Sequence, residues 1–367
     1  MNPSHAPTER APSGVAVGQV SLSAPASSLR LCSNENRIGL SPRVRAAIEE
    51  AFDTSNVYPD DSCLALTAAL AASHSVPEGC VVHGHGSTEV LRMAANLHAL
   101  REGQGILLQA GLTFEALAAY AEPFATGVVA VPLERGTWAH DLPRMREEAE
   151  RLAGHPLLAY ICNPNNPTGT LTPVDELEDW ITSAPSEVLF VIDEAYFDFV
   201  EDPSFRSLIP TAVERPNVLV LRTFSKAHAL AGLRVGYGVG HARLVESLRP
   251  LRAGRGPNHL GNVAALAAME DREFLRLSLD TMAKSKSIVL DVLSDLGLGS
   301  LPSHANFVMH EVNGPVQTYI DRMWDHGFIV GRAFPELPAH NRITLGLPEE
   351  MERWAESLRD FRQRGWV

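Results

Sequence analysis

The sequence predicts an α/β fold with a large domain, whose mostly parallel sheet is covered by helices on both faces, and a smaller α+β domain. In the middle of the chain, apolar strand-like runs alternate with amphipathic helical stretches. These runs are almost continuously apolar, as expected of strands buried on both faces. After about Pro250 a long helical region leads into short strand candidates, which is typical of a second domain.

The elements are expected in the following order. Ser41 should cap a helix that begins at Pro42, because serine favours the N-cap and proline the first helical position. Strands are predicted over 105–109, 128–133, 157–163, 188–193 and 218–224, with helices over 113–124 and 173–183 between them. The C-terminal part should contain helical residues 261–297, strands over 305–312, 328–332 and 342–347, and a helix over 349–361.

The expected domain boundaries follow the changes in composition. Residues 1–28 are rich in Pro, Ser and Ala, and we expect a flexible N-terminal arm. Residues 29–52 should contribute to the small domain and 53–252 should form the large domain. The small domain should be completed by 253–367, with no internal repeat in the chain.

Composition narrows the class of function. The formal net charge of −13 argues against nucleic acid or an anionic membrane surface as partner and fits an enzyme acting on small molecules. The four cysteines lie far apart, without the spacing of a metal site or a disulfide framework, so we expect no metal and a cytoplasmic setting. No apolar run approaches the roughly 18 residues of a membrane span.

Lysine is scarce: it occurs only at Lys226, Lys284 and Lys286, although Lys and Arg together number 31. Arginine can replace lysine as a surface charge but cannot form a Schiff base. Lys226 follows an apolar strand, whereas Lys284 and Lys286 lie in a charged amphipathic stretch and are predicted to face solvent. Lys226 is therefore the candidate for amine chemistry.

Other polar residues follow predicted strands, where ligands of parallel sheets bind. Asp193 ends VLFVID, and Asn166 lies in NPNNPTG after LLAYIC. Each has a plainer interpretation, since an Asp can cap a helix and Asn, Pro and Gly are ordinary turn residues. The loop GHGST, with Gly86, precedes a helical stretch and suits an anion or a simple turn equally well.

The motifs NPNNPTG, VIDEAY and LRTFSKAHALAGLR, in this order, resemble the fold-type I pyridoxal-phosphate aminotransferases of classes I and II. LCSNENRIG, YPD, GHGSTE and RITLGLPEE are similar to motifs of the histidinol-phosphate aminotransferase branch. The resemblance runs from about Leu31 to the C-terminus. It implies pyridoxal 5'-phosphate as cofactor and a homodimer with active sites at the interface.

The resemblance assigns roles residue by residue. Lys226 would be the catalytic residue, forming the Schiff base with the cofactor and moving a proton during the reaction. Asp193 would pair with the pyridine nitrogen, and Asn166 and Tyr196 with the phenolic oxygen. The aromatic ring of Phe114 would stack on the cofactor. The remaining cofactor contacts, mostly to the phosphate, would come from Gly86, Ser87, Thr88, Thr223, Ser225, Arg234 and the neighbouring subunit's Tyr58.

The substrate contacts implied by the resemblance are Arg342, Asn36, Arg37 and Arg332. Arg342 matches the arginine that binds the substrate's α-carboxylate as a bidentate pair. Arg37 replaces the proline of the family's NENP, and Arg332 is shifted by one residue from the arginine expected to contact the substrate phosphate. In a strand this shift would turn Arg332 to the other face. His228 replaces an apolar aromatic residue beside Lys226.

The leading hypothesis is transfer of an amino group from an amino acid or histidinol phosphate to a 2-oxo acid, and two other classes of function remain open. One is decarboxylation, since threonine-phosphate decarboxylase resembles the same branch, or another amino-acid-tailoring reaction of a specialised pathway. The other is a sensor module of a transcription regulator. The sensor would need an appended DNA-binding domain, for which only about thirty residues precede the motifs.

Overall fold

A computed structural model describes residues 28–60, 63–100, 105–254 and 256–367. The predicted N-terminal arm lies, except for residue 28, outside the described residues. In the described part of the chain no helix combines the length and apolar character needed to cross a membrane.

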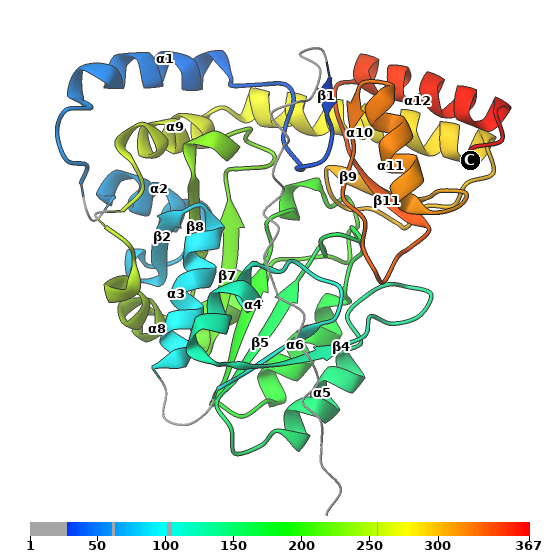
Figure 1. The fold of residues 1–367 in the computed structure, drawn as a ribbon. Coiled ribbons are helices and arrows are strands. Elements are labelled where there is room, and N and C mark those ends of the chain that lie inside the picture. Colours follow the sequence, from blue (N-terminus) through cyan, green and yellow to red (C-terminus); the bar gives the residue numbers. More distant parts are fainter. Residues whose placement is uncertain (1–27, 61–62, 101–104, 255) are drawn as a thin grey trace, which may run out of the picture.

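The centre of the molecule is a seven-stranded sheet in the order β2-β8-β7-β6-β5-β3-β4 (Figure 1). The strands are β2 Val81–His85, β3 Ile106–Ala110, β4 Gly127–Val131, β5 Leu157–Cys162, β6 Val188–Asp193, β7 Val218–Thr223 and β8 Val235–Val239. Only β8 runs antiparallel to its neighbours β2 and β7 among these strands. The predicted mostly parallel sheet is confirmed.

Helices cover both faces of this sheet. One face packs against α3 Ser87–Ala99, α4 Ala116–Ala121 and α8 Ala242–Leu248. The other face packs against α2 Leu64–His74, α5 Leu142–Arg151, α6 Val174–Ser183 and α7 Ile209–Glu214. Consecutive residues of β5 alternate between the two apolar clusters, which explains why the whole strand is apolar.

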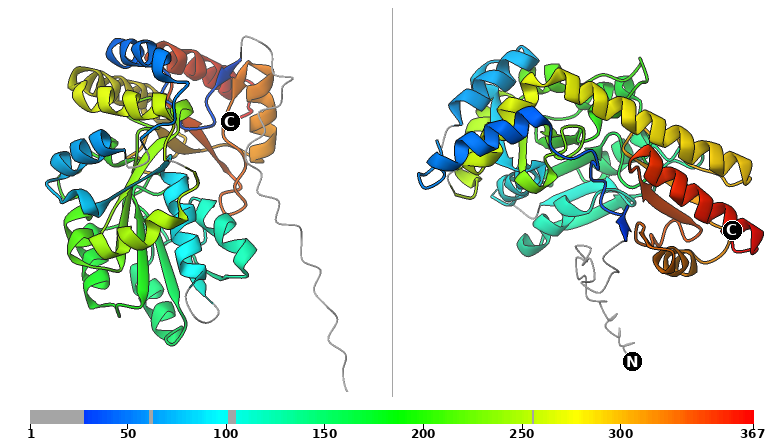
Figure 2. Two further views of the ribbon diagram at one scale, coloured as in Figure 1. Left: turned by 90° about the vertical axis from the view of Figure 1, so that its left-hand side faces the viewer. Right: turned by 90° about the horizontal axis from the view of Figure 1, so that it is seen from above.

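The small domain consists of two short sheets covered by helices. β1 Leu29–Arg30 pairs in parallel with β10 Phe328–Ile329, and β9 Phe307–Glu311 pairs antiparallel with β11 His340–Thr344. The helices are α10 Arg272–Asp295, α11 Val316–Asp325 and α12 Pro348–Gln363. α10 and α12 lie side by side, as the view from above shows (Figure 2).

Two helices pack with a different core from the one that the sequence suggested. α1 Pro42–Ala51 lies against α9 His259–Glu270, and their buried residues join the apolar cluster of the large sheet (Figure 1). Within the N-terminal segment, only Leu29 and Leu31 enter the core of the small domain. An amphipathic helix has the same pattern whichever core it covers, so its sequence does not reveal its domain.

Local signals explain where several elements begin and end. Ser41 caps α1 as predicted, its side chain accepting a hydrogen bond from the backbone N–H of Val44. The predicted helical stretch 261–297 is divided at Asp271, which caps α10 by accepting from the N–H of Phe274. The sequence analysis missed β8, VGYGV, because its two glycines are unusual in a strand interior.

Buried histidines make the stability of the fold depend on pH. Burial lowers the pKa of His83, His140 and His310 to about 4 in each case. The unfolded chain therefore binds these protons near pH 6.5, whereas the folded chain does not. Burial also lowers the pKa of His74 to about 4, whereas it raises the pKa of Asp193 to about 6, so one group opposes the effect of four histidines.

We therefore expect the melting temperature to fall as the pH falls from about 6.5 towards 4. Thermal unfolding followed by circular dichroism across this window measures the effect. A His140→Asn variant should show a shallower pH dependence than the parent protein. A melting temperature independent of pH between 6.5 and 4.5 would contradict this account.

Candidate functional site

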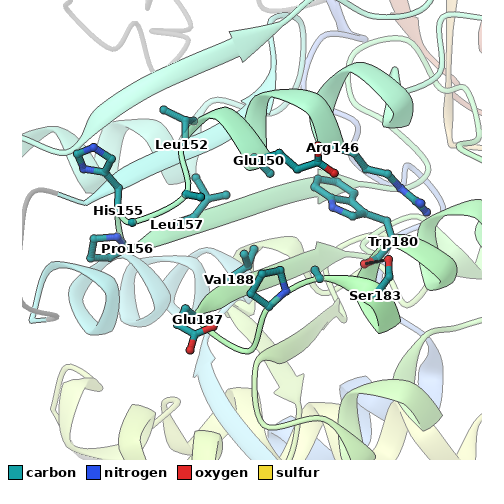
Figure 3. A pocket seen from close by; sticks show the side chains of 15 residues that line it. Arg146, Glu150, Leu152, His155, Pro156, Leu157, Trp180, Ser183, Glu187 and Val188 are labelled. Atoms are coloured by element: carbon teal, nitrogen blue, oxygen red, sulfur yellow. Dashed lines mark hydrogen bonds between the residues drawn. The ribbon is translucent and has the colours of Figure 1, made fainter.

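Among the described residues, two cavities lie at opposite ends of the central strands. One, of about 900 Å³, lies at the amino ends of β5 and β6, and its lining includes Leu152, Leu157, Trp180 and Val188 (Figure 3). The other, of about 700 Å³, lies at the carboxyl ends of the strands, where parallel sheets bind ligands. The second cavity contains the predicted chemical groups.

Twelve of the predicted site residues line this second cavity, which we call the strand-end cavity. They are Ser87, Thr88, Phe114, Asn166, Asp193, Tyr196, Thr223, Ser225, Lys226, Arg234, Arg332 and Arg342. They come from both domains, so the cavity lies between the large sheet and the small domain.

One end of the cavity is a cradle of donors around Arg234. Its guanidinium donates to Thr88 Oγ1 at 3.1 Å and approaches Ser225 Oγ at 3.5 Å. Gly86, with φ of 75°, precedes α3, and a Cβ atom there would lie 2.5 Å from Arg234 Nη2. Glycine is therefore required for the arginine to approach the helix N-terminus.

The loop after β7 completes this cradle. Thr223 Oγ1 accepts from the N–H of Ser225 at 3.1 Å and donates to Ser225 Oγ at 2.9 Å. Hydroxyls, the first N–H groups of α3 and one guanidinium form a donor set that suits a phosphate.

Asp193 lies at the carboxyl end of β6 with 2% of its surface exposed. Its Oδ1 accepts from the N–H of Ala195 and its Oδ2 from Tyr160 Oη, both at 3.1 Å. Burial raises the pKa of the carboxyl to about 6, although these two donors oppose the increase. A buried carboxylate of this kind is suited to pairing with a cation.

Asn166 is the asparagine of NPNNPTG that lines the cavity. Asn163 and Asn165 instead bond to their own loop and its neighbours, with Asn163 joined to Thr172 and Asn165 to Thr113. Asn166 Nδ2 donates to Tyr196 Oη at 3.4 Å, so the amide and the phenol lie together as predicted.

Lys226 is half-buried in the same cavity. Its Nζ donates to the backbone oxygen of Asn34 at 3.0 Å. Burial, followed by the charge of Arg342, lowers the lysine pKa to about 8. A larger share of neutral amine at physiological pH makes Lys226 a better nucleophile than an exposed lysine.

The prediction for the other two lysines is half correct. Lys284 is exposed, as expected. Lys286 is half-buried on α10, donates to the backbone oxygen of Ser303 at 3.0 Å and has a pKa lowered by burial, so it does not face solvent freely. The helical pattern did not reveal that the loop at Ser303 covers this position.

Arg342, on β11, extends into the cavity from the small domain. Its Nη1 donates to Asn166 Oδ1 at 2.6 Å and its Nη2 to the backbone oxygen of Cys32 at 2.8 Å. Its Nε is buried and has no hydrogen-bond partner. A guanidinium that keeps a buried, unpaired N–H donor is suited to binding an anionic ligand.

Arg332 lies at the cavity because it is not in a strand. β10 ends at Ile329, earlier than predicted, and the following residues are irregular. Arg332 therefore lies outside β10, and a one-residue shift does not turn its side chain to the other face of a strand. Arg332 forms an ion pair with Glu115, and its guanidinium lies 4.3 Å from the centre of the Phe334 ring.

Besides Gly86, which borders the cradle around Arg234, four predicted or questioned residues do not line the strand-end cavity. Arg37 pairs with Glu350 at 2.6 Å, and Asn36 donates to Ser278 Oγ at 2.7 Å. Their contacts join the N-terminal segment to α10 and α12, and this geometry gives no support for substrate binding. Tyr58 is 80% exposed, and His228 packs against the Phe224 ring.

The sequence analysis missed Asn34, which connects the two domains. This residue is 2% exposed with φ of 55°, and its side chain donates to Tyr196 Oη at 2.9 Å and accepts from Thr344 Oγ1 at 3.1 Å. Its backbone oxygen accepts from Lys226 and from Asn306 Nδ2. Asn34 is the first asparagine of the NEN motif, in which the sequence-based prediction named only Asn36.

The chain belongs to the aminotransferases of classes I and II, whose family model matches residues 26–358. Histidinol-phosphate aminotransferase from Brevibacillus brevis is 34% identical over 335 residues, covering 91% of this chain and 90% of the relative. The predicted aminotransferase activity and the cofactor pyridoxal 5'-phosphate are confirmed.

Solved structures agree with this assignment. One is the structure of a proposed histidinol-phosphate aminotransferase from Erwinia carotovora atroseptica, with a TM-score of 0.89 and 37% identity. It covers 95% of this chain and all of its own. Histidinol-phosphate aminotransferase from Sinorhizobium meliloti, solved with pyridoxal-5'-phosphate, has a TM-score of 0.84 and 27% identity, covering 91% of each chain.

The lowered pKa of Lys226 predicts how the cofactor combines with the enzyme. We expect the rate of recombination with the cofactor-free protein to rise as the pH rises through about 8, because only the neutral amine attacks. Lys226→Ala should lose the absorbance band of the lysine-linked cofactor, whereas Lys284→Ala, at an exposed site, should keep it. A Lys226→Ala protein that retains the band would remove this lysine from its role.

Proposed function

We propose that this protein is a histidinol-phosphate aminotransferase, which moves the amino group of histidinol phosphate to a 2-oxo acid. We infer this substrate from a pair of arginines at one end of the strand-end cavity. The guanidinium carbons of Arg332 and Arg342 lie 4.3 and 5.7 Å from the ring centre of Phe334. Two cations in one subsite suit the doubly charged phosphate ester of this donor.

The donor and the acceptor would share this subsite in turn. Arg342, with its unpaired buried Nε, would hold the substrate phosphate or the carboxylate of the 2-oxo acid. Glu115 pairs with Arg332 in the present structure and would release it for the larger charge of the phosphate. The names of the relatives support this substrate.

The geometry of the cavity supports the following proposal for the cofactor contacts. Bound pyridoxal 5'-phosphate supplies an electron sink for the electron pair released at the substrate's Cα. The donors around Arg234 would hold its phosphate, and Asp193 would hold the proton at its pyridine nitrogen. Asn166 and Tyr196 would orient its phenolic oxygen, and Phe114 would cover the ring. Lys226 Nζ would remove the proton from the substrate's Cα.

We propose a homodimer in which Tyr58 completes the partner's phosphate site. Tyr58 does not line the cavity of its own chain, and it is highly exposed together with Phe52, Val57 and Leu64. Several exposed large side chains in one short part of the chain favour a protein interface. The predicted arrangement of sites at the dimer interface accounts for both observations.

We also propose a cytoplasmic setting. None of the four cysteines forms a disulfide in the described residues: three are buried and Cys32 is half-buried. Cysteines that form no disulfide are typical of proteins in a reducing compartment.

The substrate assignment predicts a donor preference. Histidinol phosphate should give the highest kcat/KM in a panel of donors that also contains aromatic amino acids and threonine phosphate. Formation of pyridoxamine measures transamination, and release of CO₂ measures decarboxylation. Arg332→Gln should raise KM for histidinol phosphate about tenfold or more and change KM for a singly charged donor much less. CO₂ release from threonine phosphate would instead support the decarboxylase, and an equal effect on all donors would contradict the role of Arg332.

The dimer predicts complementation between subunits. Tyr58→Phe should weaken cofactor binding by roughly tenfold, since one charge-assisted hydrogen bond is worth about 1.5 kcal/mol or more. Mixing the Tyr58→Phe and Lys226→Ala chains should restore one normal site per heterodimer, measured as activity after exchange of subunits. A monomer by light scattering at micromolar concentration would rule the arrangement out.

A further inference from the structure

Tyr160 is a fully buried residue of β5 that the sequence analysis did not select. In the register of the sheet, Tyr160 is opposite Val191 and Cys162 is opposite Asp193. Side chains two residues apart on a strand point to the same face, so Tyr160, Cys162 and Asp193 share one face of the sheet. None of this phenol's surface is exposed, and it lies beneath the strand-end cavity, whose lining includes Cys162 and Asp193.

The phenol is directed at the carboxylate. Tyr160 Oη donates to Asp193 Oδ2 at 3.1 Å, across the boundary between two neighbouring strands. The N–H of Ala195 holds the other oxygen, Oδ1, at the same distance. The carboxylate is therefore fixed by one donor on each oxygen, the first from β5 and the second from the loop after β6.

The hydrogen bond from Tyr160 affects whether a proton shared between the Asp193 carboxylate and a pyridine nitrogen lies on the oxygen or on the nitrogen. A hydrogen bond to the ionised form of a carboxylate lowers its affinity for a proton, whereas burial raises it. Asp193 is buried, so without the phenol its basicity would rise. A more basic carboxylate would take the proton from a pyridine nitrogen that it faces, and the ring would then withdraw electrons less strongly.

We propose that Tyr160 is a positioning residue for the cofactor, whose hydroxyl orients the Asp193 carboxylate and keeps the shared proton on the pyridine nitrogen. This inference rests on the proposed role of Asp193 but not on the identity of the amino donor. Tyr160 touches neither the substrate nor the cofactor in this account and acts through Asp193.

The test uses the holoenzyme of a Tyr160→Phe variant, which keeps the aromatic ring in the core and removes only the hydroxyl. Tyr319→Phe is the matched control, since Tyr319 is another buried tyrosine, on α11 in the small domain, whose Oη lies 3.4 Å from His310 Nε2. Both variants are loaded with cofactor labelled with ¹⁵N in the ring, and the ¹⁵N chemical shift reports whether this nitrogen is protonated.

In Tyr160→Phe we expect the ¹⁵N signal to move towards the unprotonated value, and the ring to lose its proton about one pH unit lower than in the parent protein. The first half-reaction should slow about tenfold, with KM for the donor little changed. Tyr319→Phe should match the parent in both measurements while losing a similar amount of thermal stability.

An unchanged ¹⁵N signal in a folded Tyr160→Phe holoenzyme would overturn the proposal. So would an equal shift in Tyr319→Phe, because the effect would then come from general loosening of the core. The NMR measurement contains no amino donor, so it decides the role of Tyr160 even if a donor other than histidinol phosphate proves to be the substrate.

Discussion

Burial of opposite charges in one cavity is the constraint on which the rest of the site depends. Removal from water raises the pKa of Asp193 and lowers that of Lys226, so the two groups have values of about 6 and about 8. Both shifts have the same cause and opposite signs, since burial disfavours the charged form of either group. The amine becomes a better nucleophile, while hydrogen bonds limit the rise for the carboxylate. The cavity thus prepares two different chemical roles.

Keeping buried charges in place requires polar partners at fixed positions, and backbone groups supply many of them. Arg342 and Lys226 both donate to carbonyl oxygens of the N-terminal segment, those of Cys32 and Asn34. Asn34 also contacts Tyr196 of the large domain and Thr344 of the small domain. The segment after β1 is therefore the link that fixes the geometry between the domains, and it explains why residues so early in the chain belong to the site.

The sequence predicted the parts of the structure that local patterns determine. Alternation of apolar runs and helices predicted the sheet, and the position after a strand identified Asp193 and Asn166, because the end of a parallel strand is a local property. Contacts between distant residues were not predictable in this way. The ion pairs of Arg37 with Glu350 and of Arg332 with Glu115 depend on the final packing. The charges in the sequence do not show which acidic residue pairs with which arginine. Arg332 was misjudged because β10 is shorter than its apolar pattern suggests.

The scarcity of lysine was a useful signal, but the structure shows what gives it meaning. Both Lys226 and Lys286 are at least partly buried and have lowered pKa values, so neither rarity nor burial separates them. The surroundings of the two lysines distinguish them. Lys286 donates to a backbone oxygen from the side of a helix, and the cavity lining does not include it. Lys226 lies in a cavity of about 700 Å³ with the buried carboxylate of Asp193 and the half-buried guanidinium of Arg342. An amine becomes a catalytic candidate when a ligand can reach it and neighbouring groups can hold that ligand, and in this chain the loop after β7 meets both conditions.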